Sequence, residues 1–325
     1  MRPITGGGAF TRQNINDLNQ NFQEFQADFY IDGQYGYDGN PGTSPGLAFR
    51  TPKPLDLLLP NWRRLNNTQQ TIRVAIAGVL TYEWDAPIVN NVALIGVSGN
   101  PRQATTSGVP NGGGSTWLSP TTAADSLLTI NGQGWTVQNI YFNNSCTTAT
   151  KGCIELVGGG DPPLTADAGH SQILNCRFTG ESNGLYINGG PGFLLVQDNI
   201  FMNFDSASDC AILAGGSGGT GWQSRLFDNT FTANTIHIKA LSFAYGWEVA
   251  RNRFSYIDVG VTTTTQLDFT GGSNNSVHNN YFDLPYTTTG LAAMFVLGTN
   301  DRWYFNEFAT AVGTTIFSFG SPQTS

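Results

Sequence analysis

The sequence is poor in charged residues. Lys and Arg together number 15 and Asp and Glu 23 among 325 residues, so charged side chains make up 12% of the chain. An average globular protein has about 25%. The formal net charge is −8 at pH 7. A sparse and acidic surface does not neutralise phosphates, so nucleic acid is not an expected partner.

Cysteine is also scarce, with Cys146, Cys153, Cys176 and Cys210 as its only occurrences. No two of them have the C-x-x-C spacing of a zinc site, and we expect neither a metal nor a cofactor. We expect the four to be small buried side chains. The spacing leaves open a disulfide bond between Cys146 and Cys153.

Long apolar runs are missing as well. No stretch approaches the roughly 20 residues of a membrane span, so membrane insertion is not expected. The N-terminus carries Arg2 but neither an apolar core nor a cleavage site, so we expect no signal peptide and synthesis in a cytoplasm.

What the chain has in abundance is turn and strand formers. Glycine accounts for 40 residues and aromatic residues for 12% of the chain. Glycine and Asn suit tight turns, while Thr and aromatic residues suit pleated surfaces, so the composition predicts an all-β protein rich in turns.

One short phrase, an Asn followed closely by Phe, recurs along the chain. Its Phe residues are Phe142, Phe178, Phe201, Phe231, Phe254, Phe282 and Phe308, at steps of 36, 23, 30, 23, 28 and 26 residues. Self-similarity at a roughly constant step indicates a solenoid of stacked turns. A second short strand, which mostly ends in Gly, follows each phrase, as in Gly184–Gly190. We therefore predict two or more strands per turn, with Phe stacked inside and Asn ladders at the corners.

The N-terminal segment predicts a helix. Ile15, Leu18, Phe22, Phe25 and Phe29 follow one another at steps of 3, 4, 3 and 4 after a candidate N-cap at Thr11. Two heptads are too short to be stable alone, so we expect docking or oligomerisation through this stripe. A helix that caps the end of the solenoid is the alternative. The predicted organisation is a docking segment over 1–30, a linker and cap over 31–70, and the solenoid over 71–325.

The segment that follows resembles a known family. Asp38-Gly39, Gly42-Thr43-Ser44 and Phe49-Arg50-Thr51 are similar to the segment that precedes the first turn in the pectin-lyase-like superfamily. Val92 to Gly96 also resembles a turn of that superfamily. The resemblance implies a right-handed parallel β-helix. It also implies a short helix at Pro54–Leu59, which we expect Pro60 to end.

Proteins of this fold include pectate lyases, polygalacturonases and phage tailspike depolymerases, so we searched for their chemistry. Hydrolysis needs two carboxylates at one site, and the Asp-Asp pair of polygalacturonases is missing from the sequence. Outward positions on the second strand should instead form a row that binds glycan or is merely solvated. Aligned on the following Gly, this row reads Glu155, Tyr186, Ile212, then His237 or Lys239, then Asp268.

Two other groups of residues are candidates. Asp205 and Asp209 follow a turn and could act as an acid pair or share a cation, although Asp in turns more often bonds its own backbone. Asp161, Asp167 and His170 lie in the longest predicted loop, where variable recognition is expected.

The start of the chain carries a second resemblance. Gly6 to Thr11, followed by Asn14 to Phe22, is similar to the opening of bacteriophage virion proteins that combine fibre or β-helix segments. This implies a homotrimer on the virion surface, attached to other capsid or tail proteins through residues 1–30. We expect a non-enzymatic decoration or spike protein that contacts glycans. The alternative is a tailspike-type polysaccharide depolymerase, either a hydrolase or a lyase.

Overall fold

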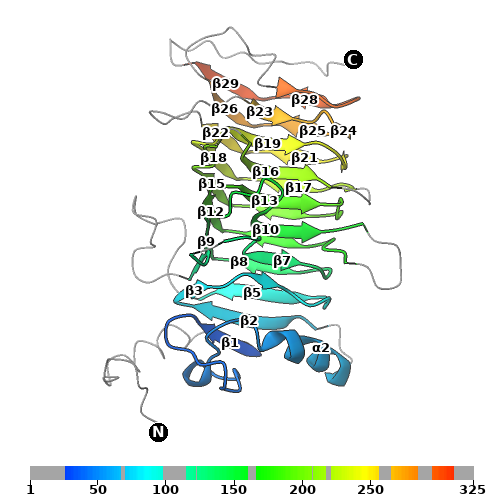
Figure 1. The fold of residues 1–325 in the computed structure, drawn as a ribbon. Helices are drawn as coiled ribbons and strands as arrows, with labels where there is room; N and C mark the ends of the chain where they lie inside the picture. The colour runs from blue at the N-terminus through cyan, green and yellow to red at the C-terminus, as the bar shows by residue number, and fades with distance from the viewer. Residues whose placement is uncertain are drawn as a thin grey trace.

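The computed structural model describes residues 26–66, 70–97, 115–121, 123–159, 166–206, 208–216, 221–255, 265–284 and 295–310. These residues wind into a right-handed parallel β-helix, an elongated rod with its turns stacked from the N-terminal to the C-terminal end (Figure 1). The predicted all-β solenoid is therefore confirmed. The predicted helix over residues 11–29 lies mostly outside the described residues, as do Ile15, Leu18, Phe22 and Phe25.

The first face of the rod is a ten-stranded parallel sheet. Its strands, in spatial order, are β1 Phe29–Asp32, β2 Ile72–Ala77, β5 Val92–Gly96, β8 Thr136–Gln138, β11 Gln172–Leu174, β14 Leu195–Gln197, β17 Arg225–Phe227, β21 Glu248–Ala250, β25 Ser276–His278 and β28 Arg302–Tyr304. Because β1 is the edge strand, the chain joins this sheet at one end of the rod.

The second face is a nine-stranded sheet that carries the recurring Phe residues. Its strands are β3 Val79–Thr81, β6 Thr116–Leu118, β9 Tyr141–Asn144, β12 Arg177–Gly180, β15 Ile200–Met202, β18 Thr230–Thr232, β22 Arg253–Ser255, β26 Tyr281–Leu284 and β29 Glu307–Thr310.

The third face is an eight-stranded sheet. Its strands are β4 Trp84–Asp85, β7 Leu128–Ile130, β10 Gly152–Val157, β13 Asn183–Asn188, β16 Cys210–Gly215, β19 Ile236–Ala240, β23 Thr265–Asp268 and β27 Phe295–Val296. A small two-stranded sheet consists of β20 Ala244–Tyr245 and β24 Gly272–Ser273. In the sequence, each of these strands follows a strand of the third face and precedes a strand of the first face.

A regular turn therefore has three strands, which agrees with the prediction of two or more. From β8 to β28 the strands of the ten-stranded sheet are three residues long, and only two residues separate each of them from the next strand in the chain. In one turn β14 ends at Gln197, Asp198 and Asn199 form the corner, and β15 begins at Ile200. The sequence phrase spans this corner, which is why two strands were taken for one.

The two corner residues have different tasks. The first adopts positive φ on each of seven turns: Asn139, Asn175, Asp198, Asp228, Arg251, Asn279 and Phe305, with φ between 48° and 60°. Asn and Asp tolerate this left-handed conformation better than other residues with a side chain. The second residue points inward and is Asn on the later turns.

These inward Asn residues form the predicted ladder. The side-chain nitrogen of Asn199 donates to Oδ1 of Asn229, and the same bond links Asn229 to Asn252, Asn252 to Asn280 and Asn280 to Asn306, each at 3.0 Å. All five residues are at most 4% exposed. Each buried amide therefore has hydrogen-bond partners along the rod, as buried polar groups require.

The recurring Phe residues stack as predicted. From Phe142 the ring centroids follow one another at 5.4, 4.8, 5.0, 4.8, 4.7 and 5.1 Å up to Phe308. Trp117 extends the stack toward the N-terminal end, 5.7 Å from Phe142. This column is the continuous core of the rod.

One helix of the described residues, α2 Leu55–Asn66, covers the N-terminal end of the rod beside the short 3-10 turn η1 Pro45–Leu47 (Figure 1). The prediction that Pro60 ends the helix was wrong. A proline inside a helix costs about 3 kcal/mol, but Leu55 and Leu59 are fully buried against the first turns and offset that cost. Phe29 begins strand β1 instead of completing the predicted helical stripe.

Candidate functional site

The outward row on the eight-stranded sheet exists, and four of its predicted residues belong to it. Strand register pairs Glu155 with Tyr186, Tyr186 with Leu213, Leu213 with Lys239, and Lys239 with Asp268. Leu213, and not Ile212, occupies the third position. Ile212 is fully buried in the core.

His237 was wrongly considered for this row. Its side chain is fully buried, and its ring centroid lies 5.8 Å from that of Phe231 and 5.6 Å from that of Phe254. Burial lowers the pKa of His237 to about 3. The imidazole is therefore a neutral core residue that no surface ligand can reach.

Glu155 lies at the centre of a closed polar network. Its Oε1 accepts a hydrogen bond from Asn188 at 2.8 Å, and its Oε2 accepts from Ser126 at 3.1 Å and from Lys151 at 3.2 Å. Lys151 also pairs with Asp125 at 2.7 Å. The carboxylate of Glu155 is thus fixed by three donors of its own chain.

Charges within this network shift the pKa values of its members. Desolvation lowers the pKa of Lys151, but hydrogen bonding and attraction to Asp125 and Glu155 outweigh this effect and raise it. Burial and the negative charge of Glu155 raise the pKa of Tyr186, although Lys151 opposes them. Lys151 therefore stays charged and Tyr186 stays neutral at ordinary pH, so the network offers a fixed pattern of donors and acceptors.

At the far end of the row, Asp268 is also engaged locally. Its Oδ1 accepts from the backbone N–H of Thr270 at 3.0 Å and from the Thr270 hydroxyl. Lys239, its neighbour in register, is partly exposed and can meet a ligand.

The structure does not arrange Asp205 and Asp209 as a matched pair. Asp205 is exposed, whereas Asp209 is 2% exposed and accepts a long hydrogen bond from Ser208 at 3.4 Å. Burial is the main cause that raises the pKa of Asp209, with a smaller contribution from the charge of Asp205. The second carboxylate oxygen of Asp209 is buried without a hydrogen-bond partner.

The predicted recognition loop is described only in part, and Asp161 lies outside the described residues. Asp167 accepts hydrogen bonds from the Gly169 backbone at 2.8 Å and from the Gln133 side chain at 2.5 Å. His170 is exposed at the corner before β11, and its ring stacks on that of Phe193.

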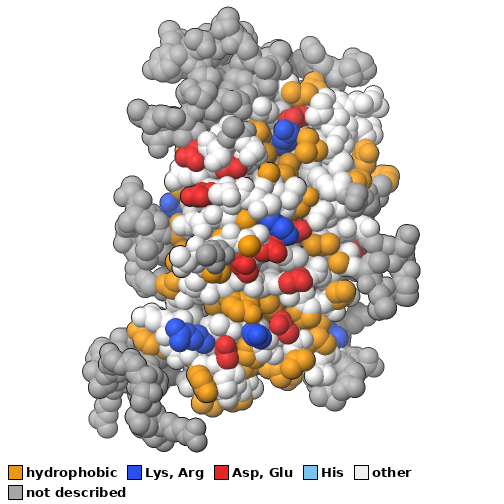
Figure 2. All heavy atoms as spheres, viewed as in Figure 1, with side chains coloured by type: hydrophobic (Ala, Val, Ile, Leu, Met, Phe, Trp, Pro, Cys, Tyr) orange, Lys and Arg blue, Asp and Glu red, His pale blue; other side chains and the backbone are white. Residues whose placement is uncertain are grey.

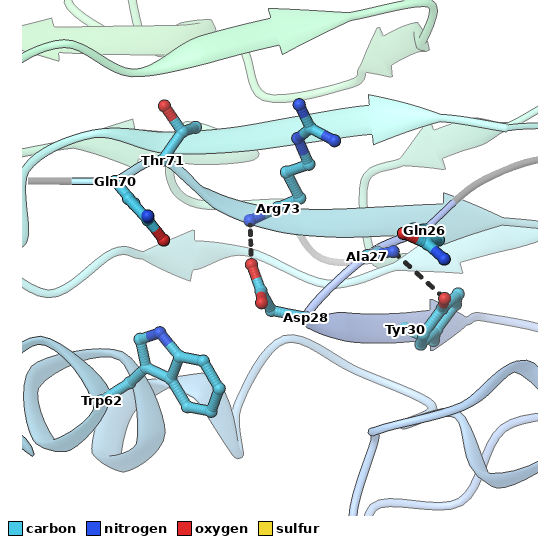
Figure 3. A pocket seen from close by; sticks show the side chains of 8 residues that line it. All are labelled: Gln26, Ala27, Asp28, Tyr30, Trp62, Gln70, Thr71 and Arg73. Carbon is cyan, nitrogen blue, oxygen red and sulfur yellow. Dashed lines mark hydrogen bonds between the residues drawn. The ribbon is translucent and has the colours of Figure 1, made fainter. Parts of the chain in front are cut away.

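A pocket that the sequence did not predict lies at the N-terminal end of the rod (Figure 3). It has a volume of about 610 Å³. Its lining combines two aromatic rings with charged and amide side chains: Gln26, Ala27, Asp28, Tyr30, Trp62, Gln70, Thr71 and Arg73.

Strand pairing and α2 together build this pocket. The Asp28 carboxylate accepts the backbone N–H of Arg73 at 2.8 Å, and the Tyr30 hydroxyl accepts the N–H of Ala27 at 3.1 Å. The Arg73 side chain extends away from Asp28, and Trp62 reaches toward the strands from the helix (Figure 3). Trp62 is held edge-on against Phe29 at 5.5 Å. We did not predict this contact from the sequence, because we expected Pro60 to end the helix before Trp62.

The visible surface of the rod carries few charges. Figure 2 shows acidic and basic side chains as scattered, mixed spots among uncharged polar atoms. All four cysteines are buried and free, so no bond joins Cys146 and Cys153. Within the described ranges, no helix has the length and apolar character needed to cross a membrane.

Neither a protein-family model nor a curated protein sequence matches this chain. Solved structures of similar shape include DFA-IIIase from Arthrobacter chlorophenolicus A6, with 15% identity and a TM-score of 0.48 over 86% of this chain and 68% of that one. The same enzyme without its lid gives 15% identity and a TM-score of 0.46, over 89% and 91%. Pectin methylesterase PemA from Erwinia chrysanthemi gives 10% and 0.40, over 90% and 92%. At such low identities the likeness concerns the fold alone.

Proposed function

We propose that this protein is a structural component of a bacteriophage virion surface. It forms a rod, as a homotrimer, that is fixed to capsid or tail proteins through its N-terminal segment and contacts glycans with its sides. The phage assignment rests on the opening sequence from Gly6 to Phe22.

One observation supports anchoring through the N-terminal segment. Strand β1 is the edge strand of the ten-stranded sheet, so the described chain enters the rod at its end and not at its side. The pocket around Trp62 and Arg73 lies at that same end. An end-on attachment leaves the three faces of the rod free, which suits a protein that projects from a particle.

The two carboxylates of the row from Glu155 to Asp268 suit binding more than acid–base chemistry. Glu155 is held by three donors and Asp268 by Thr270, so each carboxylate is committed to its own chain. A general acid or base must instead be free to exchange a proton with its substrate. These groups can still orient a bound sugar through their neighbours.

Deletion of residues 1–25 tests the anchoring, because it removes the segment but keeps β1 intact. We expect the shortened protein to retain the β-sheet circular dichroism and Tm of the full chain, and to be missing from purified particles. Arg73→Glu, an exposed change at the same end, should reduce incorporation more than Lys239→Glu on the side of the rod. Incorporation of the shortened protein at the full-length level would exclude anchoring through this segment.

A second experiment addresses the depolymerase alternative. The full-length protein is incubated with acidic and neutral polysaccharides, and new reducing ends and the absorbance of unsaturated uronates are measured. The structural role predicts no turnover above a buffer control. Turnover that disappears in Asp205→Asn or Asp209→Asn would replace the proposed function with a depolymerase.

A further inference from the structure

Aromatic residues line one corner of the rod on four consecutive turns, three of them exposed and the fourth, Tyr245, partly exposed. This corner aromatic set consists of His170, Phe193, Trp222 and Tyr245, and it lies where the chain passes from the eight-stranded to the ten-stranded sheet. Backbone hydrogen bonds hold the turns in register: His170 N–H donates to Gly192, Phe193 N–H to Trp222 and Gln223 N–H to Tyr245, at 2.7–2.9 Å. Phe193 is 49% and Trp222 51% exposed.

The rings of the corner aromatic set pair along the rod axis. The centroids of His170 and Phe193 are 4.9 Å apart, with their planes within 4° of parallel. Trp222 and Tyr245 are 6.2 Å apart and tilted by 44°. The two pairs therefore place ring surface on four neighbouring turns, which lie about 4.8 Å apart.

The backbone at this corner favours other residues. His170 and Phe193 have φ values of 60° and 59°. The equivalent positions on other turns are Asn91, Gly134, Gln223, Gly246, Asn274 and Asn300, all with positive φ, and Trp222 and Tyr245 each stand one residue before this position. Gly and Asn adopt this conformation readily, whereas a bulky side chain there is an outlier.

Phe193 therefore brings strain to the fold and recovers little through burial, since half of its surface is exposed. Strained residues that the fold does not require are found where a ligand is held. We infer that the ring serves a contact outside this chain.

The size and charge of the corner aromatic set indicate which kind of partner makes this contact. A stable protein interface takes about 20–30 residues on each side, and four rings on one corner supply far fewer. Asp167, three residues before His170, is bound to Gln133 and Gly169, and Glu248, three residues after Tyr245, pairs with Arg225 and His278. The set presents apolar rings beside amides such as Gln223, which suits the apolar C–H faces and hydroxyls of neutral sugars.

We propose that the corner aromatic set binds a neutral polysaccharide strand that lies along the rod. The proposal rests on the glycan contact suggested above, and it places that contact at the corner instead of on the row from Glu155 to Asp268. A polysaccharide strand that follows the rod axis can contact the rings on all four turns.

The test uses the full-length protein and neutral hexasaccharides, with cellohexaose, maltohexaose and mannohexaose as probes and hexagalacturonate as the charged comparison. Binding is followed by calorimetry and by the emission of Trp222. We expect a neutral probe to bind and to shift this emission to shorter wavelength. Phe193→Asn combined with Trp222→Ala should weaken binding about tenfold or more, since each ring contributes roughly 1 kcal/mol.

Two controls separate the possible causes of such a loss. Phe305→Asn changes a residue with the same backbone conformation, 64% exposed, at the other corner, and should leave affinity unchanged. Phe193→Asn places a residue that suits this backbone, so its Tm should stay within a few degrees of wild type. Binding that is lost in Lys239→Ala but kept in the corner variants would overturn the corner site and leave the glycan contact in place. Failure of every probe to bind would overturn both, while anchoring would still be decided by the deletion of residues 1–25.

Discussion

Asn229 and Asn252 are joined by two hydrogen bonds to one atom. Oδ1 of Asn252 accepts the side-chain N–H of Asn229 at 3.0 Å and its backbone N–H at 2.9 Å. The amide nitrogen of Asn252 donates to the carbonyl oxygen of Leu226, one turn earlier. A single buried amide therefore links its own turn to the one before it through three hydrogen bonds.

Asn252→Ala should consequently destabilise the rod strongly. The substitution removes the acceptor of two buried N–H groups of Asn229 and one donor to the Leu226 carbonyl, and each unsatisfied group costs about 1–3 kcal/mol. We expect a loss of roughly 2–5 kcal/mol in the free energy of unfolding, measured by urea denaturation. Asn279→Gly is the matched control, because Asn279 is exposed and glycine accepts its positive φ. A change below 1 kcal/mol in Asn252→Ala would contradict a structural ladder.

Phe231→Ala tests the aromatic column. The ring lies 5.0 Å from Phe201 and 4.8 Å from Phe254, fully buried. Large-to-small changes of this kind cost about 3–5 kcal/mol. Thermal unfolding should show the loss, whereas Phe305→Ala, at an exposed position, should stay within roughly 0.5 kcal/mol of wild type. Equal effects of the two changes would argue against the column as the core.

His237 predicts an acid sensitivity of the fold. Its pKa is about 3 in the folded protein, against about 6.5 in an unfolded chain. The unfolded state therefore takes up a proton first as the pH falls, and stability is lost from pH 6.5 down toward 3. His237→Phe should reduce the slope of stability against pH in this window by up to about 1.4 kcal/mol per unit. Urea titrations of both proteins from pH 7.5 to 4 measure the difference, and parallel curves would show that the imidazole is not buried as a neutral group.

Asp209 should act in the opposite direction. Because burial raises its folded pKa above the unfolded value, the stability it contributes is fully present at low pH and is lost as the pH rises through the folded pKa. Asp209→Asn removes this penalty. The variant should have the higher Tm at pH 7.5, and the gap should close as the pH falls below the usual range of aspartate. Asp205→Asn, at the exposed neighbour, should shift Tm less, and a lower Tm for Asp209→Asn at pH 7.5 would contradict the argument.

The Phe repeat was sufficient to predict the coil, because each Phe must meet its counterpart one turn away for the core to be continuous. Phe178 pairs with Phe201, and Phe201 with Phe231, in register. The repeat did not separate the corner residue from the ladder residue, since Asn occurs at both. Asn175 is a corner residue and Asn199 a ladder residue, although each stands shortly before a Phe.

The candidate site was harder to predict, because inward and outward residues do not alternate at the start of strand β19 in the eight-stranded sheet. His237 and Ile238 are consecutive, and both are fully buried. A strict period of two therefore placed His237 outside. The pocket near Trp62 was missed for another reason: tertiary packing of Leu55 and Leu59 overrides the tendency of Pro60 to end a helix.

The Asn ladder also gives the rod a direction. From Asn199 to Asn280, each side chain donates to the turn that follows it in the chain, and Asn306 ends the described series as an acceptor. During synthesis, the last turn formed therefore has an Asn side-chain N–H without its acceptor until the next turn supplies the Oδ1 oxygen of its own Asn. Growth from the N-terminal end completes the hydrogen bonds one turn at a time. A chain interrupted within the ladder would therefore end in an edge of unpaired donors.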